Sequence, residues 1–238
     1  MKNFLLLPTY NERENIKLII PEIFKLIPEI NILVIDDNSP DNTAGAVKEL
    51  MFIYPNLSIL QRPAKTGLGN AYKEGINKVI ENEETYYIIT MDADGSHSPE
   101  YLPEFISNIK NYDLVIGSRY VKGGGIENWE VWRKNLSRFG NLYAKILTGL
   151  PINDFTAGFM CIKRDFLKKI DFNQISSSGY SFLIELKFYL IYGLKAKAKE
   201  VPIIFKSRRE GESKISNQII SEGIKTPWRL LSKRIWKK

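Results

Sequence analysis

The chain has 238 residues, of which 44% are hydrophobic and 26% charged, enough apolar material for one large or two small globular domains. Its single cysteine, Cys161, excludes a disulfide framework and a cysteine-rich zinc site within one chain, and favours a reducing, cytoplasmic setting. The formal net charge of +7 predicts an anionic partner, such as a phosphorylated substrate, an acidic membrane surface or nucleic acid. No apolar run approaches the roughly 18 residues of a membrane span, so the sequence predicts that the chain does not cross a bilayer unaided.

Five short apolar runs alternate along the chain with segments of helical length. The runs lack polar alternation, which is typical of strands covered on both faces; they are residues 3–8, 31–36, 57–61, 86–90 and 113–118. The helical segments between and after them are residues 11–27, 39–51, 66–81 and 98–110. This order predicts an α/β fold in which helices flank a mostly parallel central sheet, joined by right-handed crossovers.

A polar cluster follows each predicted strand. The clusters are "PTYNE" (8–12), "DDNSPDNT" (36–43), "KTGLGNA" (65–71), "DADGSH" (92–97) and "SRY" (118–120). In open sheets of this kind, ligands bind beyond the carboxyl ends of the strands. The sequence therefore predicts that these clusters meet at one edge of the sheet and form a single site.

The glycine-rich phosphate loops of common nucleotide-binding folds are missing from the sequence. A dinucleotide fingerprint would follow the first strand, where "PTYNE" stands, and Gly67 and Gly69 have Tyr72 in place of a third glycine. A nucleotide would therefore be held through a metal and side chains. Asp92 and Asp94 are the candidates, since residues two apart in extended chain point to the same side and carboxylates suit Mg²⁺ or Mn²⁺.

The ordered motifs resemble those of a family 2 glycosyltransferase, and most closely the dolichol-phosphate (polyprenol-phosphate) mannosyltransferases. The resemblance covers roughly residues 3–214 and depends on the clusters above together with "RKNLSRFGN", "DFTAGF", "GYSFLIELKF" and "RREGESK". It implies a GT-A (Rossmann-like) fold and an inverting, metal-dependent transfer of mannose from GDP-mannose to a polyprenyl (dolichyl) phosphate.

The resemblance also implies roles for particular residues. Asp94 is the most direct ligand of the divalent metal, with Asp92 beside it, and the role of Ser96 is left open because Gly95 replaces the usual leucine. Arg133 and Ser137 match positions that bind the lipid phosphate. Asp94, Arg119, Arg208 and Lys214 are the catalytic candidates. The nucleotide-sugar pocket is formed by Pro8, Tyr10, Glu12, Ile35, Asp37, Asp92, Ala93, Asp94, Arg119, Arg208 and Lys214.

Chemistry favours a phosphate as the acceptor. A sugar hydroxyl must lose a proton as it attacks and needs a general base, whereas a phosphate monoester with a second pKa of about 6 is already mostly dianionic. The sequence lacks the Q-x-x-R-W and E-D elements of polysaccharide-forming relatives and is rich in Arg and Lys after residue 119.

Two alternatives remain open at this point. The same fold could use another nucleotide sugar, such as UDP-glucose, or a hydroxyl acceptor. The non-enzyme alternative is a basic module that binds membrane surfaces; nucleic acid is the weaker ligand, because no basic helix is patterned for a major groove and no zinc-finger spacing occurs.

Four further residues have competing interpretations. His97 is either a metal ligand or, as the neighbouring Ser98 and Pro99 favour, part of a capped loop. Asp154 is structural or on the acceptor side. Glu185, a charge in an apolar helix, either faces the site or has a structural partner. Cys161 lies in an apolar run and is expected in the core.

The sequence predicts a GT-A domain over residues 1–214 and a basic amphipathic segment over 215–238. Residues 129–134 and 227–236 mix tryptophan, hydrophobic residues and cations as interfacial helices do. Together with a lipid acceptor, they predict peripheral attachment to the cytoplasmic face of a membrane, either directly or through a membrane-protein partner.

Overall fold

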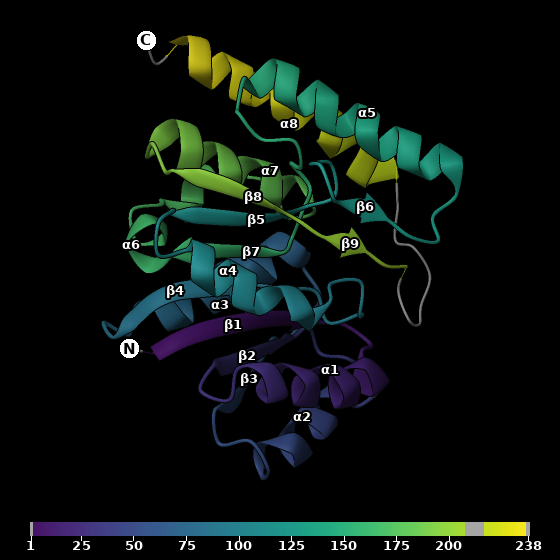
Figure 1. Cartoon of the computed structure of the whole chain (residues 1–238), viewed down its shortest axis with the longest axis vertical. Helices are drawn as coiled ribbons and strands as arrows, with labels where there is room; N and C mark the ends of the chain where they lie inside the picture. Colours follow the sequence, from purple (N-terminus) through teal and green to yellow (C-terminus); the bar gives the residue numbers. More distant parts are fainter. Residues whose placement is uncertain (1, 208–216, 237–238) are drawn as a thin grey trace.

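The computed structural model describes residues 2–207 and 217–236 (Figure 1). Within these residues, seven strands form the central sheet. Their spatial order is β3 (Leu57–Gln61), β2 (Asn31–Asp36), β1 (Lys2–Thr9), β4 (Thr85–Thr90), β7 (Met160–Lys163), β5 (Leu114–Ser118) and β8 (Ala198–Pro202). All of them run parallel except β7, which pairs antiparallel with both β4 and β5. Two short strands, β6 (Gly125–Ile126) and β9 (Ile204–Phe205), form a separate parallel pair.

Helices cover both faces of the sheet. One face packs against α1 (Arg13–Leu26), α2 (Thr43–Met51) and α4 (Leu102–Asn108), which follows the short helix η1 (Pro99–Tyr101). The other face packs against α3 (Leu68–Ile80), α6 (Arg164–Leu167) and α7 (Ser181–Phe188). The remaining short turns are η2 (Phe172–Gln174) and the π-helical η3 (Tyr189–Gly193). At one end of the molecule, α5 (Val131–Thr148) and α8 (Asn217–Trp236) lie side by side (Figure 1).

Burial on both faces explains why the strands are apolar without alternation. Leu5 and Leu7 of β1 point into the core beneath α1, whereas Leu6 between them points into the core beneath α3. All three are fully buried. Because each face of the sheet has its own helical layer, successive side chains both leave water, and no position on these strands needs to be polar.

The α/β class and the mostly parallel sheet are confirmed, and all five strands and four helical segments expected from the sequence are present. The sequence interpretation did not include β7, whose Cys161 lies opposite Ile89 of β4 and Val115 of β5. As expected, Cys161 is buried in the core.

The C-terminal helix α8 is packed against the rest of the fold. Leu230 is fully buried, Arg234 donates to the carbonyl oxygen of Thr148 (3.2 Å), and the Tyr143 hydroxyl donates to that of Ile224 (3.0 Å). The predicted boundary between residues 214 and 215 lies outside the described residues. In the part of the chain that the structure describes, no helix has the length and apolarity required to span a bilayer.

Candidate active site

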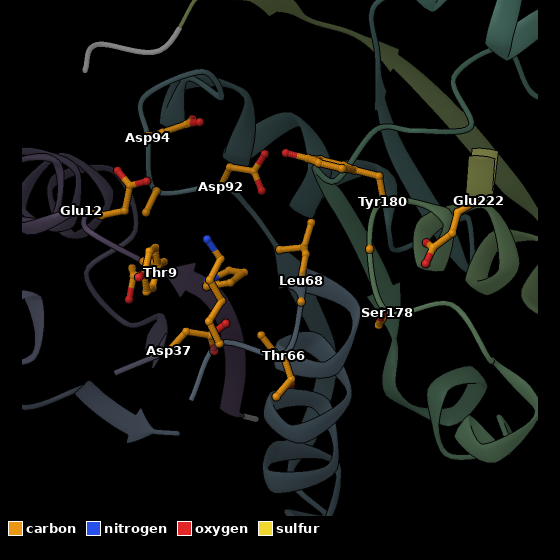
Figure 2. A pocket seen from close by; sticks show the side chains of 17 residues that line it. Thr9, Glu12, Asp37, Thr66, Leu68, Asp92, Asp94, Ser178, Tyr180 and Glu222 are labelled. Carbon is orange, nitrogen blue, oxygen red and sulfur yellow. The ribbon is translucent and has the colours of Figure 1, made fainter. Parts of the chain in front are cut away.

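Two cavities meet at the carboxyl edge of the sheet, just beyond the end of β4. The first has a volume of about 370 Å³ and the second about 640 Å³. Asp92, Asp94 and Tyr180 line both cavities and therefore mark their junction. Figure 2 shows the first cavity, with the hydroxyl of Tyr180 turned toward Asp92.

The loop that carries the two aspartates is shaped by its own hydrogen bonds. The backbone N–H of Ser96 donates to Oδ1 of Asp94 (3.0 Å), and Gly95 between them has a φ of 78°, a conformation that glycine adopts without steric cost. The N–H of Asp92 donates to Nδ1 of His97 (3.0 Å). The turn thus holds both carboxylates at the end of β4.

His97 is part of the scaffold of this loop. Its ring is 2% exposed and stacks on Phe159, with 5.0 Å between the ring centroids. Burial lowers the pKa of His97 to about 4, so the imidazole is neutral at neutral pH and can accept the bond from Asp92. This arrangement agrees with the loop role and gives His97 Nδ1 a partner other than a metal.

The donor atoms of the loop fit a hard divalent cation. Asp94 is 5% exposed, and the buried hydroxyl of Ser96 makes no hydrogen bond to any residue in the described ranges. Within residues 2–207 and 217–236, no group of three or more His, Cys, Asp or Glu side chains is gathered for a metal. Two carboxylates and a hydroxyl suit Mg²⁺ or Mn²⁺, which retain waters and take further oxygens from a diphosphate.

A network of charged side chains underlies the other end of the first cavity. Arg62, only 4% exposed, is bound to Asp37, to Glu74 (3.0 Å) and to Thr66 (2.6 Å). Burial raises the pKa of Asp37 even though Arg62 favours its charged form. The ammonium group of Lys65 lies 3.8 Å from the centre of the Tyr10 ring. These contacts fix the direction of the polar groups before any ligand binds.

Most of the predicted nucleotide-sugar residues lie around the first cavity. Those that line it are Pro8, Tyr10, Glu12, Asp37, Asp92, Ala93 and Asp94. Ile35 lies elsewhere: it is fully buried in the core, against Gly75 of α3. Because side chains alternate along β2, Ile35 and Asp37 extend from the same side of the strand, but only the residue beyond the strand end reaches the cavity.

The sequence interpretation missed several residues that line the first cavity. Lys65 and Thr66 come from the loop before α3, and Leu68 is the first residue of that helix. The "KTGLGNA" cluster predicts the correct sheet edge for this segment but no individual roles for these residues. Tyr180 had no local signal beyond its place in "GYSFLIELKF". Glu222 of α8 also reaches this wall from a segment distant in sequence.

The second cavity brings together Arg119, Arg133 and Ser137 on a largely apolar surface. The guanidinium of Arg133 lies 3.8 Å from the centre of the Trp129 ring, and Ser137 accepts a hydrogen bond from the Tyr120 hydroxyl (2.7 Å). The apolar side chains of this cavity include Trp129, Leu136, Phe139, Leu183 and Phe205. A charged end and an apolar body suit an amphipathic ligand.

Arg119 is held in a buried, bidentate ion pair with Asp154. Its Nε and Nη2 donate to the two carboxylate oxygens, each at 2.7 Å, and Nη2 also donates to Thr156 (2.7 Å). Burial alone would disfavour the charged form of both side chains, but the ion pair outweighs this effect. Asp154 raises the pKa of Arg119, and Arg119 lowers the pKa of Asp154. Asp154 therefore orients the arginine at the cavity wall.

Glu185 turns away from both cavities. It is fully buried and accepts hydrogen bonds from Arg229 of α8 (2.6 Å) and from the N–H of Ser177 (2.9 Å). Of the two interpretations of this residue, the structure therefore agrees with a structural partner. Arg208 and Lys214 lie outside the described residues.

Residues 5–171 match the family described as Glycosyl transferase family 2, and the chain belongs to this family. It is 40% identical over 224 residues to an undecaprenyl-phosphate mannosyltransferase of Micrococcus luteus, covering 94% of this chain and 91% of the relative. It is also 40% identical over 225 residues to a polyprenol monophosphomannose synthase of Mycolicibacterium smegmatis, covering 94% of this chain and 84% of the relative.

A solved structure supports the fold independently. Glucosyl-3-phosphoglycerate synthase of Mycobacterium tuberculosis, in complex with Mn²⁺, UDP and glucosyl-3-phosphoglycerate, matches with a TM-score of 0.68. The match covers 97% of this chain and 80% of that structure at 17% identity. The chain is therefore a glycosyltransferase with a GT-A-like fold.

Proposed function

We propose that the chain transfers mannose from GDP-mannose to a polyprenyl phosphate, such as dolichyl phosphate, giving polyprenyl-phosphate mannose. The observation that carries this proposal is the junction of two cavities at Asp92 and Asp94. One cavity is lined by Glu12, Asp37 and Lys65 beside the aspartate loop and suits a nucleotide, and the other joins cationic side chains to an apolar surface, as a lipid phosphate requires. The names of the relatives point to the same sugar and the same class of lipid.

On this proposal, the donor occupies the first cavity with its diphosphate at the aspartate loop. Asp94 and Asp92 would hold Mg²⁺ or Mn²⁺, with the Ser96 hydroxyl as a further oxygen. A divalent cation supplies Lewis-acid stabilisation of charge on the departing diphosphate. Solved complexes of the M. tuberculosis synthase contain Mn²⁺ or Mg²⁺ together with UDP.

The acceptor phosphate enters the second cavity beside Arg119 and Arg133. Its oxygen attacks C1 of mannose from the face opposite the diphosphate, so the new C–O bond forms as the bond to GDP breaks and the configuration at C1 inverts. The electron pair of the broken bond leaves with GDP. The dianionic phosphate needs no general base. Arg208 and Lys214 remain proposed as further contacts to the phosphates.

A lipid acceptor also requires contact with a membrane, and the exposed face of α5 and α8 suits one. Large apolar side chains on this face are well exposed, with Trp132 at 59% and Trp228 at 56%. The others are Val131, Leu136, Phe139, Leu142, Ile146, Ile224 and Ile235. We therefore propose peripheral attachment to the cytoplasmic face of a membrane.

Asp94→Asn tests the proposed function directly. It should reduce turnover of GDP-mannose with a short-chain polyprenyl phosphate by more than about a hundredfold, because loss of even an outer-shell partner costs about 10 to 100-fold at metal sites. Cation-dependent binding of GDP should weaken in parallel, measured by calorimetry. Asp171→Asn, in an exposed cap that lines neither cavity, is the matched control and should behave as wild type.

A donor and acceptor panel completes this test. GDP-mannose and UDP-glucose are each offered with a polyprenyl phosphate and with a hydroxyl acceptor. Preference for UDP-glucose or for the hydroxyl would replace the proposed substrates while keeping the enzyme class. A surface-binding module would instead be favoured by two results together: the wild type turns over no donor, and the Asp94→Asn variant still binds vesicles.

A further inference from the structure

Residues 175–180 form a strap across the start of α3, and part of this strap lines the first cavity. The carbonyl oxygen of Ser178 accepts a hydrogen bond from the N–H of Gly69 (2.7 Å), and that of Ile175 accepts one from Lys73 (2.6 Å). Ser178 and Tyr180 of the strap contribute to the cavity wall (Figure 2). These hydrogen bonds therefore fix the position of the strap relative to the start of α3.

The opposite side of the strap is held by an ion pair between α7 and α8. The Glu185 carboxylate, fully buried, accepts hydrogen bonds from Ser177 N–H (2.9 Å) and from Nη2 of Arg229 (2.6 Å). The same Nη2 lies 3.1 Å from the Ser177 hydroxyl, which is 3.3 Å from that of Thr226. Ser177 is thus bound to the charged pair, and the next residue, Ser178, has the carbonyl oxygen that accepts the hydrogen bond from α3.

We propose that Arg229 and Glu185 are positioning residues for the donor cavity, acting through Ser177 and Ser178 on the loop at the start of α3. Neither side chain lines either cavity, so the pair acts on the ligand indirectly, and its hydrogen bonds to Ser177 link it to the strap. This inference deepens the proposed function, since the cavity concerned is the one assigned to the nucleotide sugar. It adds Arg229 to Glu222 as a second residue of the C-terminal helix that acts on the donor site.

The packing leaves little room for the strap to move independently of α3. Gly67, at a φ of 105°, lies so close that a Cβ there would be 2.5 Å from the Ser178 carbonyl oxygen. A Cβ on Gly69 would be 2.7 Å from the Cβ of Phe182. The charged pair supplies directional hydrogen bonds that are stronger than neutral ones, so its loss should release the strap first at Ser177.

Arg229→Met and Arg229→Lys test the inference, with Arg234→Met as the matched control. Arg234 lies on the same helix but bonds to Thr148 at the end of α5. Glu185 is fully buried whereas the Arg229 side chain is 40% exposed, so removing the arginine alone leaves a buried carboxylate without its counter-ion and is destabilising. The double variant Glu185→Gln with Arg229→Met removes both charges and protects the test against misfolding. Amide exchange of Gly69 is read by NMR in protein without nucleotide, and affinity for GDP with Mn²⁺ is read by calorimetry.

We expect Gly69 exchange to accelerate at least about tenfold in Arg229→Met and in the double variant, with a similar loss of GDP affinity, about 1.4 kcal/mol. The KM for GDP-mannose should rise by the same factor while kcat changes little. Arg229→Lys should partly restore the slow Gly69 exchange and the GDP affinity. Arg234→Met should leave Gly69 exchange and GDP affinity unchanged.

Unchanged Gly69 exchange in a folded Arg229→Met protein would overturn the inference, as would an equal effect of Arg234→Met. The exchange measurement needs no ligand, so it is independent of the proposed substrates. Failure of the proposed function would appear separately, as a lack of GDP-mannose turnover by wild type.

Discussion

Lys187 is a buried cation that touches no ligand cavity yet supports the second one. Its ammonium group donates to the carbonyl oxygens of Phe155 (2.8 Å) and Ala157 (2.7 Å), and Ala157 lines the cavity. Burial lowers the pKa of Lys187 to about 7, and the nearby Asp154 carboxylate offsets only part of that effect. The residue should therefore make folding stability depend on pH.

The free energy of unfolding should rise between pH 7 and pH 9 by about 2 kcal/mol through Lys187 alone. In this range the unfolded chain keeps the lysine proton, because its pKa there is about 10.4, whereas the folded protein loses it. Raising the pH therefore favours the folded state, and below pH 7 both states become protonated and the effect levels off. Urea unfolding at pH 7, 8 and 9 measures the rise.

Lys187→Met should abolish this contribution, although it also leaves two carbonyl groups unpaired and lowers stability at every pH. Lys48→Met, which replaces an exposed lysine of α2, should keep the wild-type slope. Equal pH slopes for wild type and Lys187→Met would contradict the assignment.

At the scale of elements, the start of α3 shows how a helix end is built into a cavity. Gly67 precedes the helix at a φ of 105°, where an L side chain is strained, and it lies against the Ser178 carbonyl. The loop that Gly67 ends also supplies Lys65 and Thr66 to the first cavity. The backbone conformation and the shape of the cavity are therefore coupled.

Gly67→Ala should lower the free energy of unfolding by about 1 to 3 kcal/mol, from backbone strain and from the 2.5 Å approach of its Cβ to Ser178. Binding of GDP should weaken as well, because the loop must shift. Gly193→Ala is the control, since its Cβ would meet Tyr189 at an ordinary 3.9 Å. Urea unfolding and calorimetry measure both effects; a Gly67→Ala protein as stable as the control would refute the argument.

At the scale of the whole molecule, α5 and α8 expose a group of large apolar side chains at one end of the fold. Figure 1 shows α5 and α8 together at this end and α2 at the other. The second cavity is lined by residues of both helices, including Phe139 and Ile224. An apolar end that adjoins a cationic cavity would bring a lipid phosphate and its hydrocarbon chain to the site together.

Trp132→Glu combined with Trp228→Glu should weaken binding to anionic lipid vesicles at least about tenfold, equivalent to 1.4 kcal/mol. Neither tryptophan lines a cavity, so turnover of a short-chain, water-soluble acceptor should persist. Phe52→Glu, which replaces a 93% exposed residue just after α2, should leave vesicle binding unchanged. Vesicle sedimentation tests all three proteins; equal losses in both variants would exclude a specific membrane face.

The sequence alone determined the α/β class, the five strands and the loops that meet at the sheet edge, because apolar runs and turn residues act locally. Asp92 and Asp94 could be found for the same reason, because they closely follow a buried strand whose end meets the cavities.

Only the tertiary structure decided which further side chains complete the cavities and how they are held, because burial and ion pairing depend on residues distant in the chain. It buried Ile35 against α3, paired Arg119 with Asp154, and brought Tyr180 to the junction through a strap held by Arg229. A linear motif carries no record of such partners, and side chains at neighbouring positions can therefore have entirely different roles.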